Sequence, residues 1–505
     1  MAGDEGSSAG FAQATRGFSD WFQALPGATF HNDIAIEDLR HQGRGRGIIA
    51  KADIEPGTVL FTIPRGAIIC AATSTLKDRI PAVFDLENGD GDSEDEGDDG
   101  SSSSQQDSWT LLILIMIYEH LQGGASRWKP YLDILPSSFD TPMFWSPVEL
   151  CELQASALVG KIGKAEADRM IQTKILPVIR AHEDVFFALG SQRLDDAQLL
   201  ELAHRFGSTI MAYAFDLEKD DDDEKEAEGD EDADEWVEDR EGKTMLGMVP
   251  MADLLNADAE FNAHINHAED ALTATALRKI RAGEEVLNYY GPLPNGELLR
   301  RYGYVTPKHS RYDVVELPWQ LVEGELKERG GSTMSPADWE KVTQLAQADE
   351  EFEEGFVLER SGEDPDSAGQ LHSDAVFSGL PDELGEQFKT FLKAIKKVDS
   401  NAELAVRALS DRDARKELYL QTALAALGAR ERQYPTSMEE DEQIINAAGV
   451  AGRQTMAVWV RRGEKQLMRE AQSWISRELD ELRNNKTSQR TQDMDGAPAA
   501  KRRRV

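Results

Sequence analysis

The chain has 505 residues, of which 40% are hydrophobic, and its formal net charge is −38 at pH 7. This length is enough for two or three domains with separate cores. The excess of carboxylates excludes a protein that coats nucleic acid or an anionic membrane surface, and it favours a basic protein partner. Cys70 and Cys151 have no further ligands at metal-binding spacing, so we expect no metal site, no disulfide framework and a reducing compartment.

The N-terminal part of the chain is predicted to be rich in β-structure. Residues 1–17 are small and polar and are expected to be disordered. After them we expect a short helix from Phe18 to Phe22 and a strand over Phe30–Ile36. Two further β-rich runs, Ile48–Ile49 and Val59–Ile63, flank a turn at residues 55–57.

Three glycines alternate ahead of the first of these runs, at Gly43, Gly45 and Gly47. Glycines in this pattern let a backbone approach a ligand closely, and the alternative is a plain glycine-rich hairpin. Because the run precedes a strand and opens no helix, it is neither a P-loop nor a dinucleotide-binding fingerprint.

Helical patterning begins at Trp109 and is interrupted by two acidic tracts, 85–107 and 216–241, which we expect to be solvated loops. The expected helices between the tracts cover Trp109–Leu121, Cys151–Leu189 and Asp195–Phe215. The most apolar run, Trp109–Tyr118, has about half the length of a membrane span. With no signal-peptide pattern at the N-terminus, the sequence predicts an intracellular protein without a membrane segment.

The stretch Leu246–Val305 gathers the residues best suited to a binding site. An apolar run ends on Asn256, and a strand-like segment over 285–288 leads into Tyr289 and Tyr290. Tyr302 and Tyr304 follow at the end of the next expected helix. Tyrosine combines an apolar ring with one polar tip, so several together can line a narrow pocket; the alternative is an aromatic corner of the core.

The remainder of the chain is predicted to be a helical bundle with a polar tail. The expected helices cover 336–348, 380–398, 402–409, 412–431 and 439–482. The last is too long for one ordinary helix, so we expect a break at Gly449 and Gly452. The tail ends in PAAKRRRV, a short basic cluster on an acidic protein.

Together these motifs resemble the SET-domain protein lysine methyltransferases of the Rubisco lysine methyltransferase type, including the fungal ribosomal-protein enzymes and their animal nuclear counterparts. GRGRGIIAKADIEPGTVLFTIPR is similar to the N-terminal SET half, and MVPMADLLNAD with NYYG and RYGYV is similar to the C-terminal half. SRWKPYLDILP resembles the helical insert that splits the domain, and ALGARERQYPTSMEEDEQII resembles the C-terminal substrate-binding domain.

The resemblance implies an α+β fold: a β-rich SET domain split by a helical insert, followed by an all-α substrate-binding domain. The implied boundaries are a disordered N-terminus (1–17), the first SET half (18–75), the insert (76–243, with acidic loops 85–108 and 216–241), the second SET half (244–306), the helical domain (307–485) and a disordered basic tail (486–505).

The family's site roles carry over residue by residue. Tyr290 occupies the catalytic position. The residues that match cofactor-binding positions are Arg44, Gly45, Arg46, Tyr213, Asn256, Ala257 and Tyr302. Those that match or border substrate-binding positions are Trp128, Ala214, Asp216, Tyr289 and Tyr304. Ala257 stands where relatives have histidine and Ala214 where serine is usual, while Tyr289 and Tyr304 are left open between channel lining and core.

The implied activity is transfer of a methyl group from S-adenosyl-L-methionine to a lysine amine, without a metal. The implied substrate is a basic ribosomal protein, expected to belong to the large subunit, or another basic nuclear protein. The basic cluster Lys501–Arg504 predicts nuclear import and nuclear localisation. Two alternatives remain: a catalytically weak SET-fold module that binds basic proteins, and an acidic chaperone of basic proteins.

Overall fold

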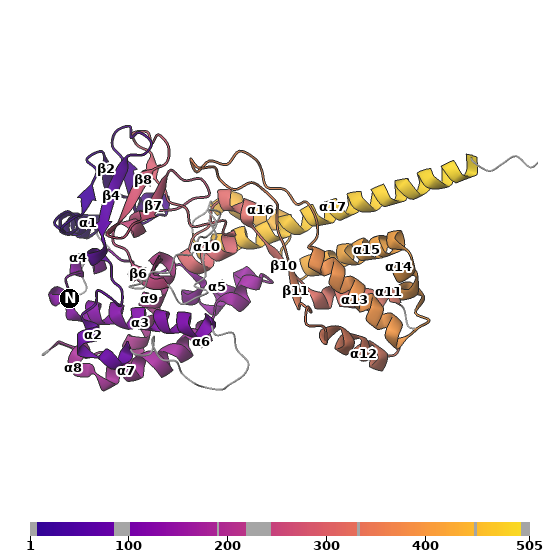
Figure 1. Cartoon of the computed structure of the whole chain (residues 1–505), viewed down its shortest axis with the longest axis horizontal. Helices are drawn as coiled ribbons and strands as arrows, with labels where there is room; N and C mark the ends of the chain where they lie inside the picture. The colour runs from indigo at the N-terminus through magenta and orange to yellow at the C-terminus, as the bar shows by residue number, and fades with distance from the viewer. Residues whose placement is uncertain are drawn as a thin grey trace, which may run out of the picture.

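The structure is a computed structural model of the whole chain, and it describes residues 8–84, 101–188, 191–218, 244–330, 334–448 and 452–495. Figure 1 shows a β-rich part at one end, a group of helices packed beside it, and a second helical part at the other end. The longest helix, α17 (Arg453–Asp495), runs from the middle of the molecule out past the second helical part.

Two antiparallel sheets join segments that are far apart in the sequence. The first has the order β1-β4-β8-β7, formed by Thr29–Phe30, Val59–Pro64, Ala271–Ala276 and Ala263–His267. The second has the order β2-β3-β9, formed by Ile34–Asp38, Arg46–Ala50 and Glu285–Val286. Strands from residues 29–64 therefore pair with strands from residues 263–286, which confirms the expected β-rich domain split by an insert.

The alternating glycines lie in a hairpin, because β2 and β3 pair antiparallel with residues 39–45 as the loop between them. The expected turn at residues 55–57 forms as well. Gly57 has a φ of 77° and the Thr58 amide donates to the Glu55 carbonyl over 3.3 Å. The runs on either side of this turn, β3 and β4, lie in different sheets, because each is bonded to other partners: Ile49 is opposite Glu285, and Thr62 is opposite Thr273. The turn thus connects two sheets.

The N-terminus is ordered further than expected, since α1 covers Ser8–Gln23. Phe18 and Phe22 are fully buried, and Ala14 packs against the same core. The first turns are held by Phe11 and Thr15, which contact arginines of the β2–β3 region. Residues 8–17 are therefore helical because side chains 25 to 35 positions further along the chain hold them. Residues 1–7 lie outside the described part.

The insert is built around α3 (Ser101–Gln122), whose residues 111–117 are all buried. It packs against α9 (Asp196–Tyr213), which begins with a capping box between Asp195 and Gln198. The helix α9 ends two residues earlier than expected. Residues 214–218 form β5 (Ala214–Glu218), which pairs with β6 (Thr244–Met248). The second acidic tract therefore begins as a strand. The rest of that tract (219–241) and residues 85–100 of the first tract lie outside the described residues.

The helices expected over 151–189 form as a series of short elements: η7 Cys151–Leu153, η8 Ala157–Lys161, α6 Lys164–Met170, a π-helical turn Ile171–Ile175, α7 Leu176–Ala181 and α8 Glu183–Phe186. The breaks have local causes, since Gly163 has a φ of 68° and Pro177 lacks an amide hydrogen. Other short elements are α2 Leu76–Arg79, α4 Lys129–Leu132, α5 Pro147–Leu150 and the 3-10 turns η1 Arg40–Gln42, η2 Arg65–Ala67, η3 Pro81–Val83, η5 Gly123–Ala125, η6 Pro142–Phe144, η10 Ala252–Leu254 and η11 Lys308–Tyr312.

The C-terminal part has its own core around Trp319, which meets Phe356 and Phe391 edge to face. Its helices are α11 Trp319–Gly330, α12 Pro336–Gln347, α13 Asp382–Val398, α14 Glu403–Ser410, α15 Arg412–Glu431, α16 Met438–Ala448 and α17. The helix α11 and a two-stranded sheet of β10 (Val315–Pro318) with β11 (Gly355–Leu358) were not expected.

The expected break near Gly452 is confirmed, because α16 ends at Ala448 and α17 begins at Arg453. The tail is less disordered than expected, since α17 continues to Asp495; the basic cluster Lys501–Arg504 lies outside the described residues. Among the described helices, none combines the length and apolar composition that a bilayer crossing requires.

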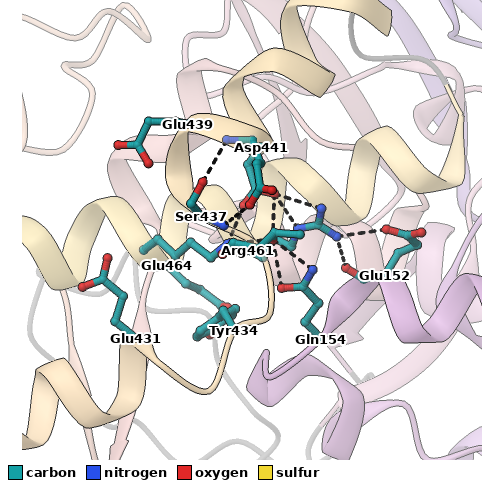
Figure 2. Close-up of polar contacts among 12 residues, drawn as sticks. Glu152, Gln154, Glu431, Tyr434, Ser437, Glu439, Asp441, Arg461 and Glu464 are labelled. Atoms are coloured by element: carbon teal, nitrogen blue, oxygen red, sulfur yellow. Dashed lines mark hydrogen bonds and ion pairs between the residues drawn. The ribbon is translucent and has the colours of Figure 1, made fainter.

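A buried set of charges joins the insert to the C-terminal helices (Figure 2). Asp441 on α16 accepts from Arg461 over 2.9 Å and from Lys465 over 2.7 Å, and all three side chains are at most 1% exposed. Arg461 also donates to the carbonyl and carboxylate of Glu152 in η7, at 2.5 and 3.0 Å. Close by, Glu464 accepts from Ser156 of the insert. The C-terminal helices are therefore fixed to the insert by specific polar contacts.

Candidate active site

Asn256 is fixed where the two SET halves meet. Its Nδ2 donates to the Arg46 carbonyl over 3.1 Å and to Glu285 Oε1 over 2.7 Å, and its own carbonyl accepts from the Asn288 amide. The preceding turn carries strain, because the buried Met251 has a φ of 83°, a conformation that side chains rarely adopt. Strain of this kind persists only where the surrounding contacts fix the backbone.

Arg44 and Glu285 complete a polar group with Asn256. Arg44 forms an ion pair with Glu285, whose side chain is only 12% exposed. A Cβ at Gly47 would lie 2.6 Å from Glu285 Oε1 and 3.0 Å from Asn256 Nδ2, so only glycine allows these groups to approach β3. Beside Gly45, in contrast, an added Cβ would meet no described atom within 4 Å. The backbone at Gly45 is therefore accessible, two residues from the glycine that packs against the fixed carboxylate and amide.

Three tyrosines lie together on the other side of this region. The rings of Tyr290 and Tyr302 stack with centroids 4.7 Å apart, and Tyr304 lies 6.1 Å from Tyr302. Each ring keeps part of its surface accessible, unlike the fully buried core residues around it. Arg44 is close enough to Tyr304 for its charge to act on the Tyr304 hydroxyl, which links the tyrosines to the polar group.

Tyr290 presents a neutral hydroxyl with a defined orientation. The hydroxyl donates to the Leu255 carbonyl over 2.9 Å. Burial, reinforced by the neighbouring Tyr304 and Tyr302, raises the pKa of Tyr290 well above its usual value. The hydroxyl therefore stays protonated at physiological pH, and its hydrogen is directed away from the lone pairs that could accept a bond from a ligand.

Asp253 belongs to the same region and was missed by the sequence analysis. One carboxylate oxygen accepts from the Tyr131 hydroxyl over 2.6 Å, and the other, Oδ1, is buried without a described partner. Burial raises the pKa of Asp253 to about 7, and burial and then Asp253 raise that of Tyr213 to about 12. The available signal was a single carboxylate in the apolar run MVPMADLL, three residues before Asn256.

The structure separates the two tyrosines that the sequence left open. Tyr304 lies with Tyr302 and has a buried hydroxyl without a described partner. Tyr289 points elsewhere and stacks on Phe261 with centroids 4.7 Å apart. Consecutive residues in an extended segment point to opposite sides, so Tyr289 and Tyr290 cannot both face the same site. The geometry therefore favours Tyr304 over Tyr289 as a lining residue.

The remaining predicted site residues differ in whether their side chains are accessible to a ligand. Tyr213 and Ala214 lie where α9 meets β5, and the exposed Asp216 follows two residues later in the same strand. Ala257 is buried and contributes only backbone, bridging to Asn288. Trp128 is 1% exposed, and its indole N–H donates to the Ala67 carbonyl over 2.7 Å. Its position therefore does not support the predicted substrate contact.

The side chain of Arg46 also faces away from the predicted site. Its guanidinium donates to Thr15 and to the Ile134 carbonyl, while its backbone carbonyl accepts from Asn256. Any cofactor contact of Arg46 would therefore be through backbone. Among the described residues, no group of three or more His, Cys, Asp and Glu side chains is placed to hold a metal ion.

Comparison with known families accounts for this arrangement. Residues 45–291 match the SET domain family, and residues 357–468 match the family described as Rubisco LSMT substrate-binding. The chain therefore contains a SET domain followed by a region that matches the Rubisco LSMT substrate-binding domain, as the motifs indicated.

Particular relatives make the comparison more specific. The chain is 31% identical over 323 residues to ribosomal lysine N-methyltransferase 4 of Saccharomyces cerevisiae, covering 63% of this chain and 60% of that protein. It is 30% identical over 274 residues to the N-lysine methyltransferase SETD6 of Homo sapiens, covering 53% of this chain and 50% of that protein. The matches thus span between half and three fifths of the length of these relatives.

Solved structures show the same fold. The SET domain of LSMT bound to lysine and AdoHcy superposes with a TM-score of 0.58 at 19% identity, covering 93% of this chain and 92% of that one. Rubisco LSMT bound to AdoMet gives a TM-score of 0.57 at 20% identity, covering 93% of both chains.

Proposed function

We propose that this protein is a protein-lysine N-methyltransferase that uses S-adenosyl-L-methionine. The observation that carries the proposal is the Tyr290 hydroxyl, held on the Leu255 carbonyl among stacked tyrosines, next to a polar group of Arg44, Asn256 and Glu285. The family match and the names of the relatives, which are lysine methyltransferases, support it independently.

The described residues fit this cofactor. Space is open beside Gly45, the Tyr304 hydroxyl and Asp253 Oδ1 are buried polar atoms without a described partner, and tyrosine faces attract cations. The residues that would hold the cofactor are the Arg44–Arg46 backbone, Tyr213, Asn256, the Ala257 backbone and Tyr302. When bound, S-adenosylmethionine supplies a methyl group on a positively charged sulfur.

The protein's own residues would orient the lysine. Since the Tyr290 hydrogen is used by Leu255, its oxygen can accept an N–H from the amine and so direct the nitrogen lone pair away from itself. Because the pKa of Tyr290 is raised, the hydroxyl does not act as a base. The lysine, with a usual pKa of about 10.4, must arrive uncharged, and loss of hydration in a narrow channel and the positive charge of a bound cofactor would both disfavour its ammonium form.

The finer proposal concerns the substrate and the compartment. A basic ribosomal protein, of the large subunit by the family resemblance, suits the net charge of −38, because long-range attraction speeds encounter, and the yeast relative's name points to the same substrate class. Import through Lys501–Arg504 would place the enzyme in the nucleus. The alternative, a catalytically weak SET-fold module that binds basic proteins, is favoured by Ala214 and Ala257, which lack the usual polar side chains.

One experiment tests both the proposed activity and the proposed substrate. Purified ribosomal subunits are incubated with methyl-labelled S-adenosylmethionine and the wild type, Tyr290→Phe or Tyr289→Phe. We expect the wild type to label a basic ribosomal protein and Tyr290→Phe to be at least about 100-fold slower with cofactor binding retained, since an orienting hydroxyl is worth about that factor. Tyr289→Phe, the matched control, should stay close to the wild type.

The outcomes separate the alternatives. Near-normal turnover by Tyr290→Phe would refute its assignment. Cofactor binding by the wild type without labelling of any ribosomal or other basic protein would favour the binding module. Labelling of other basic proteins in place of ribosomal ones would refute the proposed ribosomal substrate and would support the proposed methyltransferase activity.

A further inference from the structure

The first turns of α1 contact the two arginines that flank the glycine turn, Arg40 and Arg46. The guanidinium carbons of Arg40 and Arg46 each lie 3.8 Å from the centroid of the Phe11 ring. Two guanidinium groups cannot share one ring face at this distance, so the ring is held between them. One helical turn later, Thr15 accepts from Arg46 Nε over 2.9 Å.

Arg46 connects α1 to the candidate site. It begins β3, and its side chain is held by α1 and by the Ile134 carbonyl at 2.8 Å. Its backbone carbonyl accepts from Asn256 Nδ2, the same amide that donates to Glu285. The side chain of Arg46 thus points to α1 while its backbone forms part of the polar group.

A second contact runs from α1 to the tyrosine side. Phe18 packs against the Tyr131 ring with centroids 6.1 Å apart, and the Tyr131 hydroxyl donates to Asp253. Figure 1 shows α1 beside β2 and β4, at the edge of the β-rich part. One helix therefore supports both sides of the candidate site.

The glycine turn is closed by its own backbone, and its side chains are held from outside it. The Leu39 amide donates to the Gly45 carbonyl over 2.9 Å, and the Arg44 amide donates to the Leu39 carbonyl over 3.2 Å. The Arg40 side chain contacts Asp38 and Phe11, and Arg44 forms an ion pair with Glu285. The backbone hydrogen bonds set the internal shape of the turn, whereas the side-chain contacts set its position beside Asn256. A turn that is already held in position binds a ligand with a higher apparent affinity.

We propose that Phe11 is a positioning residue that orders the Arg40–Arg46 turn through Arg46 and thereby sets the affinity for S-adenosylmethionine. This inference rests on the proposed function, and it adds to it a determinant outside the SET core. It concerns binding of the cofactor and not the transfer step, because the ring of Phe11 contacts Arg40 and Arg46, and among the described residues it is not seen against the tyrosine group.

The test uses the full chain with three substitutions. In Phe11→Ala, titration calorimetry should give a dissociation constant for S-adenosylmethionine that is about five- to tenfold higher than in the wild type, the loss expected for cation–π contacts. The KM for the cofactor should rise by the same factor and kcat should change much less. Phe11→Trp keeps an aromatic face and should restore the affinity. Gln13→Ala, on the exposed face of the same helix, is the matched control.

A second readout protects the test from a simple folding defect. Hydrogen exchange of the amides of residues 40–46 should increase in Phe11→Ala without ligand, while exchange in α3 and β4 stays unchanged. If Phe11→Ala binds S-adenosylmethionine within twofold of the wild-type affinity, the role of Phe11 is overturned and the proposed function is not affected. A loss of affinity that Phe11→Trp does not reverse, or that Gln13→Ala shares, would also overturn it. A wild type that binds no S-adenosylmethionine would overturn the proposed function together with it.

Discussion

At the scale of single residues, neighbouring positions with the same chemistry have different roles. Tyr290 stacks on Tyr302 and donates to Leu255, whereas Tyr289 stacks on Phe261. Asp253 and Asp258 both flank Asn256, but Asp253 accepts from the Tyr131 hydroxyl, whereas Asp258 accepts from the Ala259 amide and the Thr306 hydroxyl. Residue type therefore indicated the chemistry of the site, and backbone direction selected which residue performs it.

Asp253 makes stability depend on pH in a predictable direction. Burial raises its pKa to about 7 in the folded protein from a usual value near 3.8, so the folded state holds the proton more tightly. Stability should then fall as pH rises through the window between these values, by at most about 1.4 kcal/mol per unit. Asp253→Asn holds no such proton and should lack this fall.

The measurement is urea unfolding of both proteins at pH 5 and pH 8. The unfolding free energy of the wild type minus that of Asp253→Asn should decrease by about 2 kcal/mol between these values. Asp313, whose pKa burial also raises to about 7, is present in both proteins and cancels in the difference. A difference that does not change with pH would contradict the assigned ionisation.

At the scale of elements, strand β3 shows how closely the site is packed. It lies between β2 and β9, and its Gly47 is directly opposite Glu37. The alternating glycines have different functions: Gly47 provides close approach of Asn256 and Glu285, while Gly45 borders open space. The sequence identified the run, and the structure distinguished its members.

Gly47→Ala should therefore destabilise the protein and weaken cofactor binding together. The new Cβ would lie 2.4 Å from Leu39 Cδ1 and 2.6 Å from Glu285 Oε1, so either a side chain or the strand must move, at a cost of about 1–3 kcal/mol. Thermal unfolding and calorimetric titration with S-adenosylmethionine measure the two effects. Gly45→Ala is the control for stability and should unfold near the wild-type temperature; equal melting temperatures for all three proteins would refute the packing argument.

At the scale of the whole molecule, the buried charges of Figure 2 fix the C-terminal helices against the insert. Arg461, Asp441 and Lys465 come from α16 and α17, and their contacts extend to Glu152 in η7. Beside them, an open groove of about 640 Å³ lies between α15, α16 and α17, and it contains none of the candidate site residues. The helical domain is thus held to the insert through a polar junction.

Asp441→Asn tests this junction. Removing the carboxylate leaves Arg461 and Lys465 buried with one fewer negative partner, which should cost about 3–5 kcal/mol of unfolding free energy. Glu478→Gln, which breaks the partly exposed pair with Lys416 in the same helical domain, should cost less than about 1 kcal/mol. Both unfolding free energies are measured by chemical denaturation. Equal losses for the two substitutions would show that the buried charges contribute no more to stability than an exposed ion pair does.

The sequence by itself determined the order of the motifs, through which it resembles a SET domain, and the span of helix α15, which depends on residue type and local periodicity. The catalytic role of Tyr290 stays a prediction from that resemblance. Only the tertiary structure decided that β3 and β4 belong to different sheets, that residues 8–17 are helical and that Trp128 is buried. It also decided that Tyr304 packs beside Tyr302 while Tyr289 stacks on Phe261. The physical reason is distance along the chain. Ile49 pairs with Glu285 and Arg46 with Asn256, and contacts between residues more than 200 positions apart leave no local pattern to read.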